Sequence, residues 1–486
     1  MMQPELYFHQ KEALNVAYDK TAFAWFMEMG TGKSAIIIHE ISHLIEREEI
    51  NCAIILAPNN VHVNWKSEFL IHCPNIEKIG IQIWRTGQDK EKREAETRAI
   101  LNSGKTLVFL MNIEAISTTT GREYLKRILS ARRKAYLAID ESHKIKNPTA
   151  IRTKSAIELS KFAKIRRIAT GTEAEEGIEN LFSQFKFLDP NIIGTRSYTA
   201  FKAMFCVMGG FENREIKGYR NETILAKNIA PHIYSKRKKD CLDLPDKVYV
   251  RHEISPTMEQ FKLYRQLEEE LIIELKNGII IDATMAITRI MRLQQILCGH
   301  INSSERIQSD GKTQYVLSRQ YNETIPSNRA SYVAEIVDEA SSKVIVFCRF
   351  IKDVELVVLA LANAGIGSIG ISSLVDGHDR MAEIDRWRKE PHLKALVMTT
   401  ATGGVGLTLN EANTTIFYSN SWSATDRIQA EDRNHRIGQN DKVTYHDIVV
   451  PNTVDDKLLR ALLSKQKDSI AFRNLTDVVR FLTEAE

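Results

Sequence analysis

Short apolar runs alternate with segments of helical periodicity from the start of the chain to about residue 190. The runs carry apolar residues at consecutive positions and end in polar residues. This pattern is typical of strands that are buried on both faces of a parallel sheet. It predicts a first parallel sheet whose strands include 22–26, 53–56, 106–110, 135–139 and 167–169.

Helical patterns replace this alternation between about 190 and 330. Ser255 and Pro256 form a favourable N-cap and first-turn pair for a long helix. That helix would carry its apolar residues at helical spacing, at Phe261, Tyr264, Leu267, Leu271 and Leu275. A second helix is expected from Met285 to Leu297, and Asp310-Gly311 predicts a hairpin turn within the polar stretch 301–326.

A second alternating region begins near Arg329, with strands expected at 343–348, 367–371, 395–398, 415–418 and 443–445. The chain is therefore expected to have an α/β fold made of two parallel-sheet lobes, with helical insertions between and beside them. We place the first lobe at 1–240, with a helical protrusion from about 190. The second lobe is placed at 241–486, with a helical and hairpin insertion at about 256–328.

The residue stretch 27–34 joins the first expected strand to a helix and has the features of a phosphate-binding loop. Gly30 and Gly32 let backbone N–H groups turn inward at the helix N-terminus, where they can bind phosphate oxygens. Lys33 can then reach the β- and γ-phosphates, and the Ser34 hydroxyl can bind Mg²⁺. Met27 stands where the usual pattern begins with glycine, so this stretch taken alone is a partial match.

Polar residues follow the other strands at the edge where open α/β sheets bind ligands. Asp140 and Glu141 follow 135–139, and Thr170-Gly171-Thr172 follows 167–169. Asp140 is the candidate Mg²⁺ ligand, and Glu141 is the candidate base that orients and deprotonates a water molecule. Arg433 and Arg436 in the second lobe would stabilise the transferring phosphoryl group, so hydrolysis would require closure of the two lobes.

Composition and charge narrow the function further. The net charge of +4 is small, so contacts with nucleic acid must come from local patches. The six cysteines are scattered and form no C-x-x-C pair, so neither a metal cluster nor a disulfide framework is expected. No segment approaches the length of a membrane span, and no targeting signal is evident; we expect a cytoplasmic protein.

Several motifs, taken in order along nearly the whole chain, resemble the Swi/Snf-like family of superfamily-two helicases. Residues 399–409, Trp422 and 429–439, which end in His-Arg-Ile-Gly-Gln, resemble motifs V and VI of this family. Asp140-Glu141-Ser142-His143 resembles motif II, and Thr170-Gly171-Thr172 resembles motif III. Gln10 matches the adenine-reading glutamine, and 236–239 with Leu244-Pro245 resembles the basic inter-lobe linker.

The resemblance implies two RecA-like lobes, ATP and Mg²⁺ as cofactors, and a monomeric motor that tracks along double-stranded or branched DNA. Carried over to this chain, it implies nucleotide contacts from Gln10, Met29, Gly30, Thr31, Gly32, Lys33, Ser34, Gly406 and Gln429. It implies DNA contacts from Asn59, Asn60, Asn112, Arg349, Thr399, Thr400 and Trp422. It implies coupling between the two sites through His143, Thr170, Gly171 and Thr172.

Three departures from the family pattern, Met27, Glu173 and Thr402, put the fine coupling in doubt but leave the catalytic residues in place. Each candidate also has a plainer interpretation. Asp140-Glu141 can be a solvated strand end, and Trp422 can be a packing residue. Arg433 and Arg436, three apart in a helical pattern, can pair with Glu431 or Asp432. The order and number of motifs favour the motor.

We therefore expect an ATP-dependent DNA translocase or helicase that acts on branched or forked DNA in recombination, repair or replication. By analogy with small members of this family, we expect it in a bacterial or phage-infected cell. Two alternatives remain open. One is an RNA-directed helicase, which the Gly438-Gln439 ending of motif VI disfavours. The other is a nucleic-acid clamp that does not hydrolyse ATP, which the intact Lys33, Glu141 and Arg436 disfavour.

Overall fold

The computed structural model describes residues 4–58, 61–171, 177–210, 215–276, 283–303, 307–309, 312–314, 321–372, 377–403 and 407–463. The chain divides into two compact units, Met1–Asp243 and Leu244–Glu486, which we call the N-terminal and C-terminal units. Among the described helices, none combines the length and apolarity needed to cross a bilayer.

The N-terminal unit is built on a seven-stranded sheet in the order β3-β4-β2-β5-β6-β1-β9, and its strand pairs are parallel. Each predicted strand is present. The sheet consists of β1 (Ala22–Met27), β2 (Cys52–Ala57), β3 (Ile79–Ile83), β4 (Thr106–Asn112), β5 (Ala135–Asp140), β6 (Ile165–Thr170) and β9 (Ile233–Lys236). Every residue of β1, β2 and β5 is buried, so both faces of these strands are covered. The apolar runs were therefore correctly interpreted.

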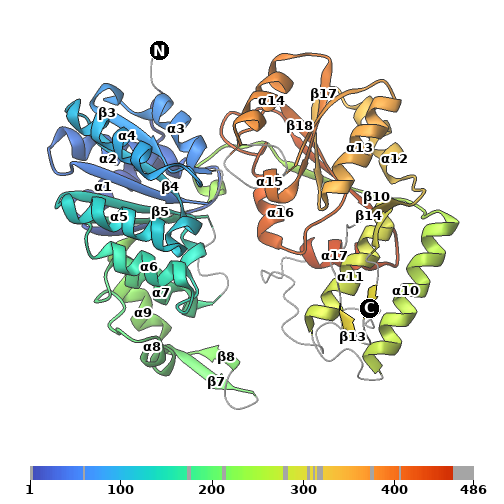
Figure 1. The fold of residues 1–486 in the computed structure, drawn as a ribbon, viewed down its shortest axis with the longest axis horizontal. Coiled ribbons are helices and arrows are strands. Elements are labelled where there is room, and N and C mark those ends of the chain that lie inside the picture. Colours follow the sequence, from blue (N-terminus) through green and yellow to red (C-terminus); the bar gives the residue numbers. More distant parts are fainter. Residues whose placement is uncertain are drawn as a thin grey trace. The chain divides into compact units, whose positions relative to one another are not determined.

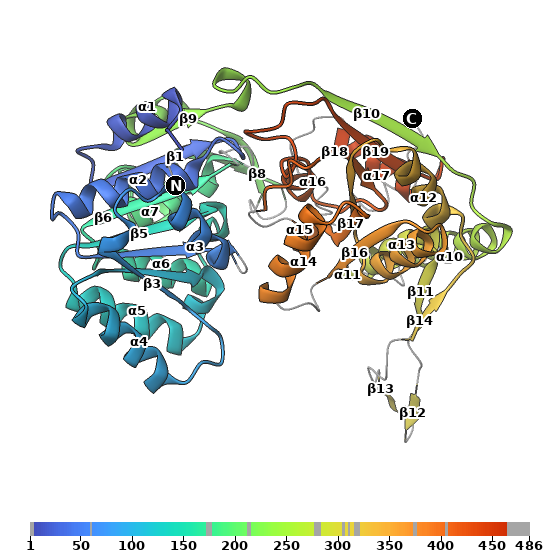
Figure 2. The ribbon, with the colours of Figure 1, turned by 90° about the horizontal axis from the view of Figure 1, so that it is seen from above.

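Helices connect the successive parallel strands of this sheet (Figure 1). They are α2 (Lys33–Glu46), α3 (Val61–His72), α4 (Lys90–Asn102), α5 (Thr119–Ala131), α6 (Ile151–Ser160) and α7 (Leu181–Leu188), whereas α1 (Phe8–Ala17) precedes β1. After α7 come α8 (Tyr198–Phe205), the antiparallel pair β7 (Cys206–Gly209) and β8 (Glu215–Tyr219), and α9 (Glu222–Ile229). Strand β9 then returns to the sheet edge beside β1 (Figure 2).

The C-terminal unit contains a six-stranded sheet in the order β10-β19-β18-β15-β17-β16, also parallel. Its strands are β10 (Lys247–Glu253), β15 (Lys343–Cys348), β16 (Gly367–Ile371), β17 (Leu393–Thr399), β18 (Ala412–Phe417) and β19 (Val443–Val449). The five predicted strands are confirmed. Strand β10 was not predicted, because its alternating pattern precedes the helical region, yet it pairs with β19 at the edge. The α/β fold class with two parallel-sheet lobes is thus confirmed.

The helical insertion of this unit consists mainly of α10 (Met258–Lys276) and α11 (Ala283–Cys298). The Ser255-Pro256 cap was wrong: Thr257 precedes α10, and its hydroxyl accepts the Gln260 backbone N–H at 3.2 Å. The Gln260 side chain in turn accepts the Thr257 N–H at 3.0 Å, which completes a capping box. The hairpin prediction is supported by β12 (Ile307–Ser309) and β13 (Lys312–Gln314), which pair antiparallel. Asp310 and Gly311 themselves lie outside the described residues.

The remaining elements of the C-terminal unit complete its layers. The antiparallel pair β11 (His300–Ser303) and β14 (Tyr321–Thr324) follows α11. The helices packed with the sheet are α12 (Arg329–Glu339), α13 (Ile351–Asn363), α14 (Gly377–Lys389), α15 (Thr400–Gly403), α16 (Ala424–Glu431) and α17 (Val454–Leu463).

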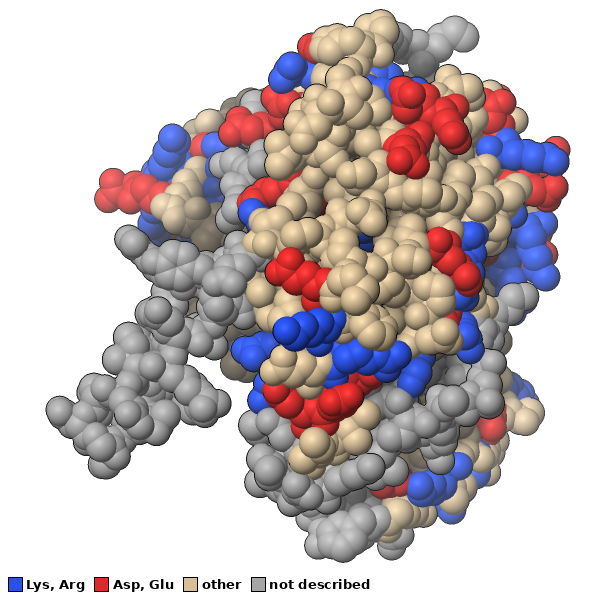
Figure 3. Space-filling view, turned by 90° about the vertical axis from the view of Figure 1, so that its right-hand side faces the viewer, with Lys and Arg blue, Asp and Glu red and all other residues tan. Residues whose placement is uncertain are grey.

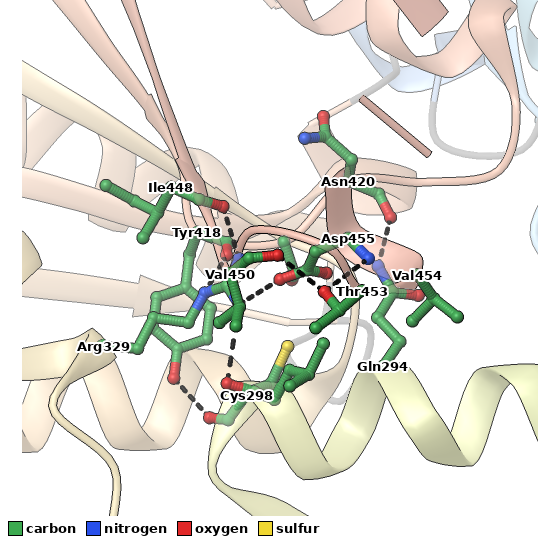
Figure 4. A network of polar contacts seen from close by, with 12 residues as sticks. Gln294, Cys298, Arg329, Tyr418, Asn420, Ile448, Val450, Thr453, Val454 and Asp455 are labelled. Atoms are coloured by element: carbon green, nitrogen blue, oxygen red, sulfur yellow. Dashed lines mark hydrogen bonds and ion pairs between the residues drawn. The ribbon is translucent and has the colours of Figure 1, made fainter. Parts of the chain in front are cut away.

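Arg329, at the start of α12, ties these elements together (Figure 4). Its guanidinium donates to the Tyr418 carbonyl at 2.7 Å, to the Ile448 carbonyl and to Asp455 at the start of α17. The arginine is 1% exposed. An ionised group is costly to bury without partners. The network therefore stabilises the positions of the ends of β18 and β19 relative to α12 and α17.

Replacing Arg329 by alanine should lower the unfolding free energy of the C-terminal unit by about 3–5 kcal/mol, since Asp455 would stay buried without the guanidinium. Hydrogen exchange of the amides in β15 and β18 measures this loss within the unit. The control is Arg386→Ala on α14, where the arginine pairs with Glu383 and Glu390 on an exposed helix face. That surface pairing should be worth at most about 1 kcal/mol. Equal losses in the two variants would contradict the assignment.

A histidine pair joins β10 to β19. The Nε2 of His252 lies 2.8 Å from the Nδ1 of His446, and the two rings stack with centroids 5.1 Å apart. Tyr332 of α12 places its hydroxyl 2.9 Å from the Nδ1 of His252. Burial lowers the pKa of His446 to about 4, with a further lowering from His252, while Asp447 opposes the shift. Burial also lowers the pKa of His252, against Asp447 and Glu339.

The fold should therefore lose stability in mild acid. Because the pKa of folded His446 lies below the unfolded value of about 6.5, its contribution is complete above that pH and is lost as the pH falls toward the folded value. We expect wild type to lose more stability between about pH 7.5 and about pH 5 than His446→Gln does, as measured by urea midpoints. The exposed His392 serves as control: His392→Gln should follow wild type. An unchanged acid loss in His446→Gln would refute the assignment.

Candidate nucleotide site

The phosphate-binding loop has the predicted strand-turn-helix form between β1 and α2. Gly30 and Gly32 have φ angles of 77° and 86°, in the left-handed region that favours glycine. The Nζ of Lys33 donates to the Met27 carbonyl at 2.9 Å and to the Glu28 carbonyl at 3.3 Å. Met27, the departure from the family pattern, is the fully buried end of β1. Its carbonyl therefore helps hold the lysine over the loop.

Gln10 is packed directly against this loop. Its Nε2 donates to the Thr31 carbonyl at 3.0 Å, and the Nε2 of the neighbouring His9 lies 2.9 Å from the same oxygen. Its Oε1 accepts the Tyr7 backbone N–H at 2.9 Å. The structure therefore brings together Gln10, Thr31 and Gly32, three of the residues that the family resemblance assigned to the nucleotide; their contact with a nucleotide stays a prediction. Met29, Gly30, Lys33 and Ser34 lie in the same loop or at its exit into α2.

Asp140 and Glu141 lie at the carboxyl end of β5. Asp140 is 9% exposed, and its Oδ2 accepts the indole N–H of Trp65 at 3.2 Å. Burial and the adjacent Glu141 raise the pKa of Asp140 to about 7, although the Lys33 ammonium pulls in the opposite direction. A dry carboxylate beside a second carboxylate is a setting that a divalent cation would stabilise, so the residues fit Mg²⁺.

Glu141 adopts a left-handed backbone conformation, with φ of 56°, which is uncommon for a residue with a Cβ. Its Oε2 lies 3.3 Å from the Nδ1 of His143, and the Thr170 hydroxyl is 3.5 Å from the same nitrogen. The residues predicted to couple the two sites thus include a contact from motif II to motif III. Thr172 and Glu173 lie outside the described residues.

Gly171 carries this arrangement back to the phosphate-binding loop. A Cβ placed on Gly171 would come within 2.6 Å of the Cγ of Met29, so only glycine lets the end of β6 approach the loop this closely. On the other side of motif II, the Ser142 hydroxyl donates to the Gln184 Oε1 of α7 at 2.6 Å. Loop, motif II and motif III therefore form one packed unit.

Arg433 and Arg436 come together in the C-terminal unit. Their Nη1 atoms lie 3.4 Å and 3.2 Å from the Leu407 carbonyl. Neither arginine is on a helix, contrary to the helical pattern, because α16 ends at Glu431 and a turn follows. Gln429 lies within α16, while Gly406 and the side chain of Thr402 are not described. Motifs V and VI thus meet at Leu407.

The candidate DNA-binding residues of the C-terminal unit gather at the carboxyl ends of β15 and β17. Arg349 follows β15, and its Nη1 lies 3.3 Å from the Ser421 hydroxyl. Thr399 ends β17, and the Thr400 hydroxyl donates to the Cys348 carbonyl at 3.0 Å.

Trp422 donates its indole N–H to the Gln294 Oε1 of α11 at 3.0 Å and packs against the helical insertion. In the N-terminal unit, Asn112 ends β4; Asn59 and Asn60 are not described.

Charges of both signs are interspersed on the described part of the face shown in Figure 3, with uncharged residues between them. This face does not present a single-sign field of the kind that would attract a polyanion over a wide area. Among the described residues there is also no cluster of three or more histidine, cysteine or acidic side chains that could hold a metal ion.

Four residues of the site were not found from the sequence. Trp65, Gln184 and Gln294 belong to helices, and the hydrogen bonds to Asp140, Ser142 and Trp422 depend on which face of each helix meets the sheet. Glu28 lies in the phosphate-binding loop, but its contact with Lys238 N–H at 2.6 Å joins distant segments. No local pattern distinguishes these residues.

Comparison with known proteins agrees with this geometry. A family model described as SNF2-related domain matches residues 9–302, and one described as helicase conserved C-terminal domain matches 328–438. The chain belongs to the SNF2-related family.

Curated relatives resemble nearly the whole chain. An uncharacterized ATP-dependent helicase of Mycoplasma genitalium is 24% identical over 93% of this chain and 40% of its own length. The transcription regulatory protein SNF2 of Saccharomyces cerevisiae is 26% identical over 90% of this chain and 26% of its own length. DNA excision repair protein ERCC-6 of Mus musculus is 24% identical over 90% of this chain and 30% of its own length. The chain thus spans less than half the length of these relatives.

Among solved structures, the SWI2/SNF2 ATPase core of Sulfolobus solfataricus in complex with dsDNA is similar, with a TM-score of 0.42 and 21% identity. The match covers 100% of this chain and 98% of that one.

Gly32→Ala should weaken nucleotide binding, because the added Cβ would lie 2.1 Å from the Nε2 of Gln10. We expect an affinity loss for ADP of about tenfold or more, equivalent to about 1.4 kcal/mol, measured by titration calorimetry. Gly87→Ala is the matched control: its φ of 81° resembles the 86° of Gly32, but nothing lies within 4 Å of its Cβ. It should lose about 1–2 kcal/mol of stability and keep its affinity. Equal affinities in the two variants would contradict the contact.

Proposed function

We propose that this protein hydrolyses ATP with Mg²⁺ and uses the cycle to translocate along double-stranded DNA, as a monomer. One observation carries the proposal. Lys33 lies close enough to Asp140 and Glu141 for its charge to act on the pKa of Asp140. The phosphate-binding loop that holds Lys33 is contacted by Gln10, which donates to the Thr31 carbonyl. Family membership supports ATP use.

The chain's own groups have defined tasks in this reaction. Mg²⁺, when bound, offsets the charge of the triphosphate, and Ser34 and Asp140 would hold it. Lys33 leaves the Met27 and Glu28 carbonyls to bind the β- and γ-phosphates. Glu141 orients the attacking water and accepts its proton, with His143 beside it.

Arg433 and Arg436 supply positive charge to the transferring phosphoryl group. They come from the other unit, so hydrolysis depends on closure. A cycle of closure and release then becomes a step along the DNA.

The polar residues at strand ends suit contacts with phosphates rather than bases. Hydroxyl, amide and guanidinium groups at Asn112, Arg349, Thr399 and Thr400 can position a duplex without reading its sequence. A motor that passes every base pair requires this type of contact. We extend the proposal to branched or forked DNA in recombination, repair or replication. The similarity to DNA excision repair protein ERCC-6 supports a role in repair.

Phosphate release with blunt duplex, forked DNA, a Holliday junction or RNA tests the substrate. Duplex-stimulated release supports the proposal, and greater stimulation by forks or junctions supports the branched substrate. Stimulation by RNA alone would contradict the proposal and support an RNA-directed helicase, and an inert wild type would contradict it and support a nucleic-acid clamp.

Glu141→Gln should reduce kcat by about 100-fold or more while ATP binding persists, since the amide cannot accept the proton of the water. Lys33→Ala should abolish turnover and also weaken ATP binding. The control is Glu123→Gln on α5, an exposed carboxylate whose replacement should leave kcat unchanged. Undiminished hydrolysis in Glu141→Gln would refute the role of Glu141 as base.

A further inference from the structure

The segment that joins the two units, 236–247, is held at each end by a residue of the proposed nucleotide machinery. We call it the connecting segment. The chain passes through it from β9 to β10 (Figure 2). The connecting segment includes the basic residues 236–239, and the sequence alone does not indicate what they contact.

The N-terminal end of the connecting segment is bound to the phosphate-binding loop through Glu28. The Glu28 backbone N–H donates to the Lys236 carbonyl at 3.0 Å, which extends the pairing of β1 with β9. The Glu28 side chain accepts the Lys238 backbone N–H at 2.6 Å. The same residue's carbonyl accepts from Lys33 and from the Thr31 hydroxyl. Glu28 therefore contacts both the phosphate-binding lysine and the connecting segment.

The C-terminal end of the connecting segment is bound through His435 to the turn that carries Arg433 and Arg436, which we call the arginine turn. The Nε2 of His435 donates to the Pro245 carbonyl at 2.8 Å, and a carbonyl can only accept, which assigns the proton to this nitrogen. His435 is 8% exposed and lies between Arg433 and Arg436 in the chain. Lys247 adds a second link, since its Nζ donates to Glu431 at 2.9 Å.

Little chain remains between these two anchors. Lys238 and Pro245 are seven residues apart, and a fully extended chain spans at most about 3.6 Å per residue. A 3₁₀ turn at Lys238–Asp240 and a hydrogen bond from Leu242 N–H to the Lys238 carbonyl at 2.8 Å shorten that reach further. A short connection anchored at both ends transmits displacement, whereas a long free one does not.

We propose that the connecting segment couples the phosphate-binding loop to the arginine turn, with Glu28 and His435 as positioning residues. When Lys33 leaves the Glu28 carbonyl for phosphate, the loop and Lys238 shift together. The displacement reaches Pro245 and, through His435, the turn that carries both arginines. This inference rests on the proposed ATP hydrolysis and names the link that regulates it.

A double-mutant cycle on duplex-stimulated ATP hydrolysis tests the coupling. Glu28→Ala and His435→Ala should each lower kcat about tenfold with an unchanged KM for ATP. The double variant should be no worse than either single one, because one lost anchor already releases the connecting segment. Glu28→Gln and His435→Gln keep an acceptor and a donor, respectively, and should retain most of the activity. Multiplying effects, about 100-fold in the double variant, would overturn the proposal.

An insertion tests the segment without touching either anchor. Six glycine and serine residues placed between Asp240 and Cys241 should lower kcat as much as a single anchor variant does. The same insertion after Gly87, in an exposed turn, should leave kcat unchanged. Full activity with the lengthened segment would overturn the proposal.

Limited trypsin digestion separates this inference from the proposed function, because it needs only nucleotide binding. Mg²⁺ and ADP should slow cleavage after the exposed Arg237 about fivefold or more in wild type, and should have no effect in Glu28→Ala. Cleavage that ignores bound ADP in wild type overturns the coupling, whereas an absence of ATP hydrolysis in wild type overturns the proposed function alone.

Discussion

The charge balance at the carboxyl end of β5 is the constraint on which the N-terminal unit depends. Burial and the adjacent Glu141 raise the pKa of Asp140 to about 7, although the hydrogen bond from the Trp65 indole lowers it. The Lys33 ammonium is the nearby positive charge that works against this cost. A parallel sheet makes this balance possible, because β1 and β5 end at the same edge and bring loop and carboxylates together.

The C-terminal unit supports its arginine turn with a second buried charge network. Arg427 of α16 donates to Glu431 at 2.8 Å and to Asp447 of β19, and it lies 3.5 Å from the Phe417 ring centroid. Glu431 also accepts from Lys247 and Tyr249 of β10. The residue before the arginine turn, Glu431, is therefore held in place by side chains of α16 and β10. Gln294 of the helical insertion donates to the Asn420 carbonyl (Figure 4). Its side chain also accepts the indole N–H of Trp422.

Elements with a strong local signal were predictable. Apart from β3, β9 and β10, which were not predicted, the strands of both sheets followed from apolar runs, and the phosphate-binding loop followed from Gly30, Gly32 and Lys33. Elements decided by competition between neighbours were not. Thr257 caps α10 although Ser255-Pro256 has equal local merit, because Thr257 also pairs reciprocally with Gln260 and donates to the Pro326 carbonyl. Strand β10 contains half-buried and exposed residues, and it forms a sheet edge by pairing with β19, whose sequence lies almost 200 residues away.

The sequence by itself determined the fold class, the order of the motifs and the residue types proposed to bind a nucleotide, since these depend on periodicity and on the chemistry of single residues. Only the tertiary structure decided what each of those residues contacts. Trp422 reaches Gln294, Glu28 reaches Lys238, and His435 reaches Pro245, across separations of 128, 210 and 190 residues. Contacts of this kind form when whole layers pack, and a hydrogen-bond donor in the sequence does not specify which distant carbonyl or carboxylate it will meet.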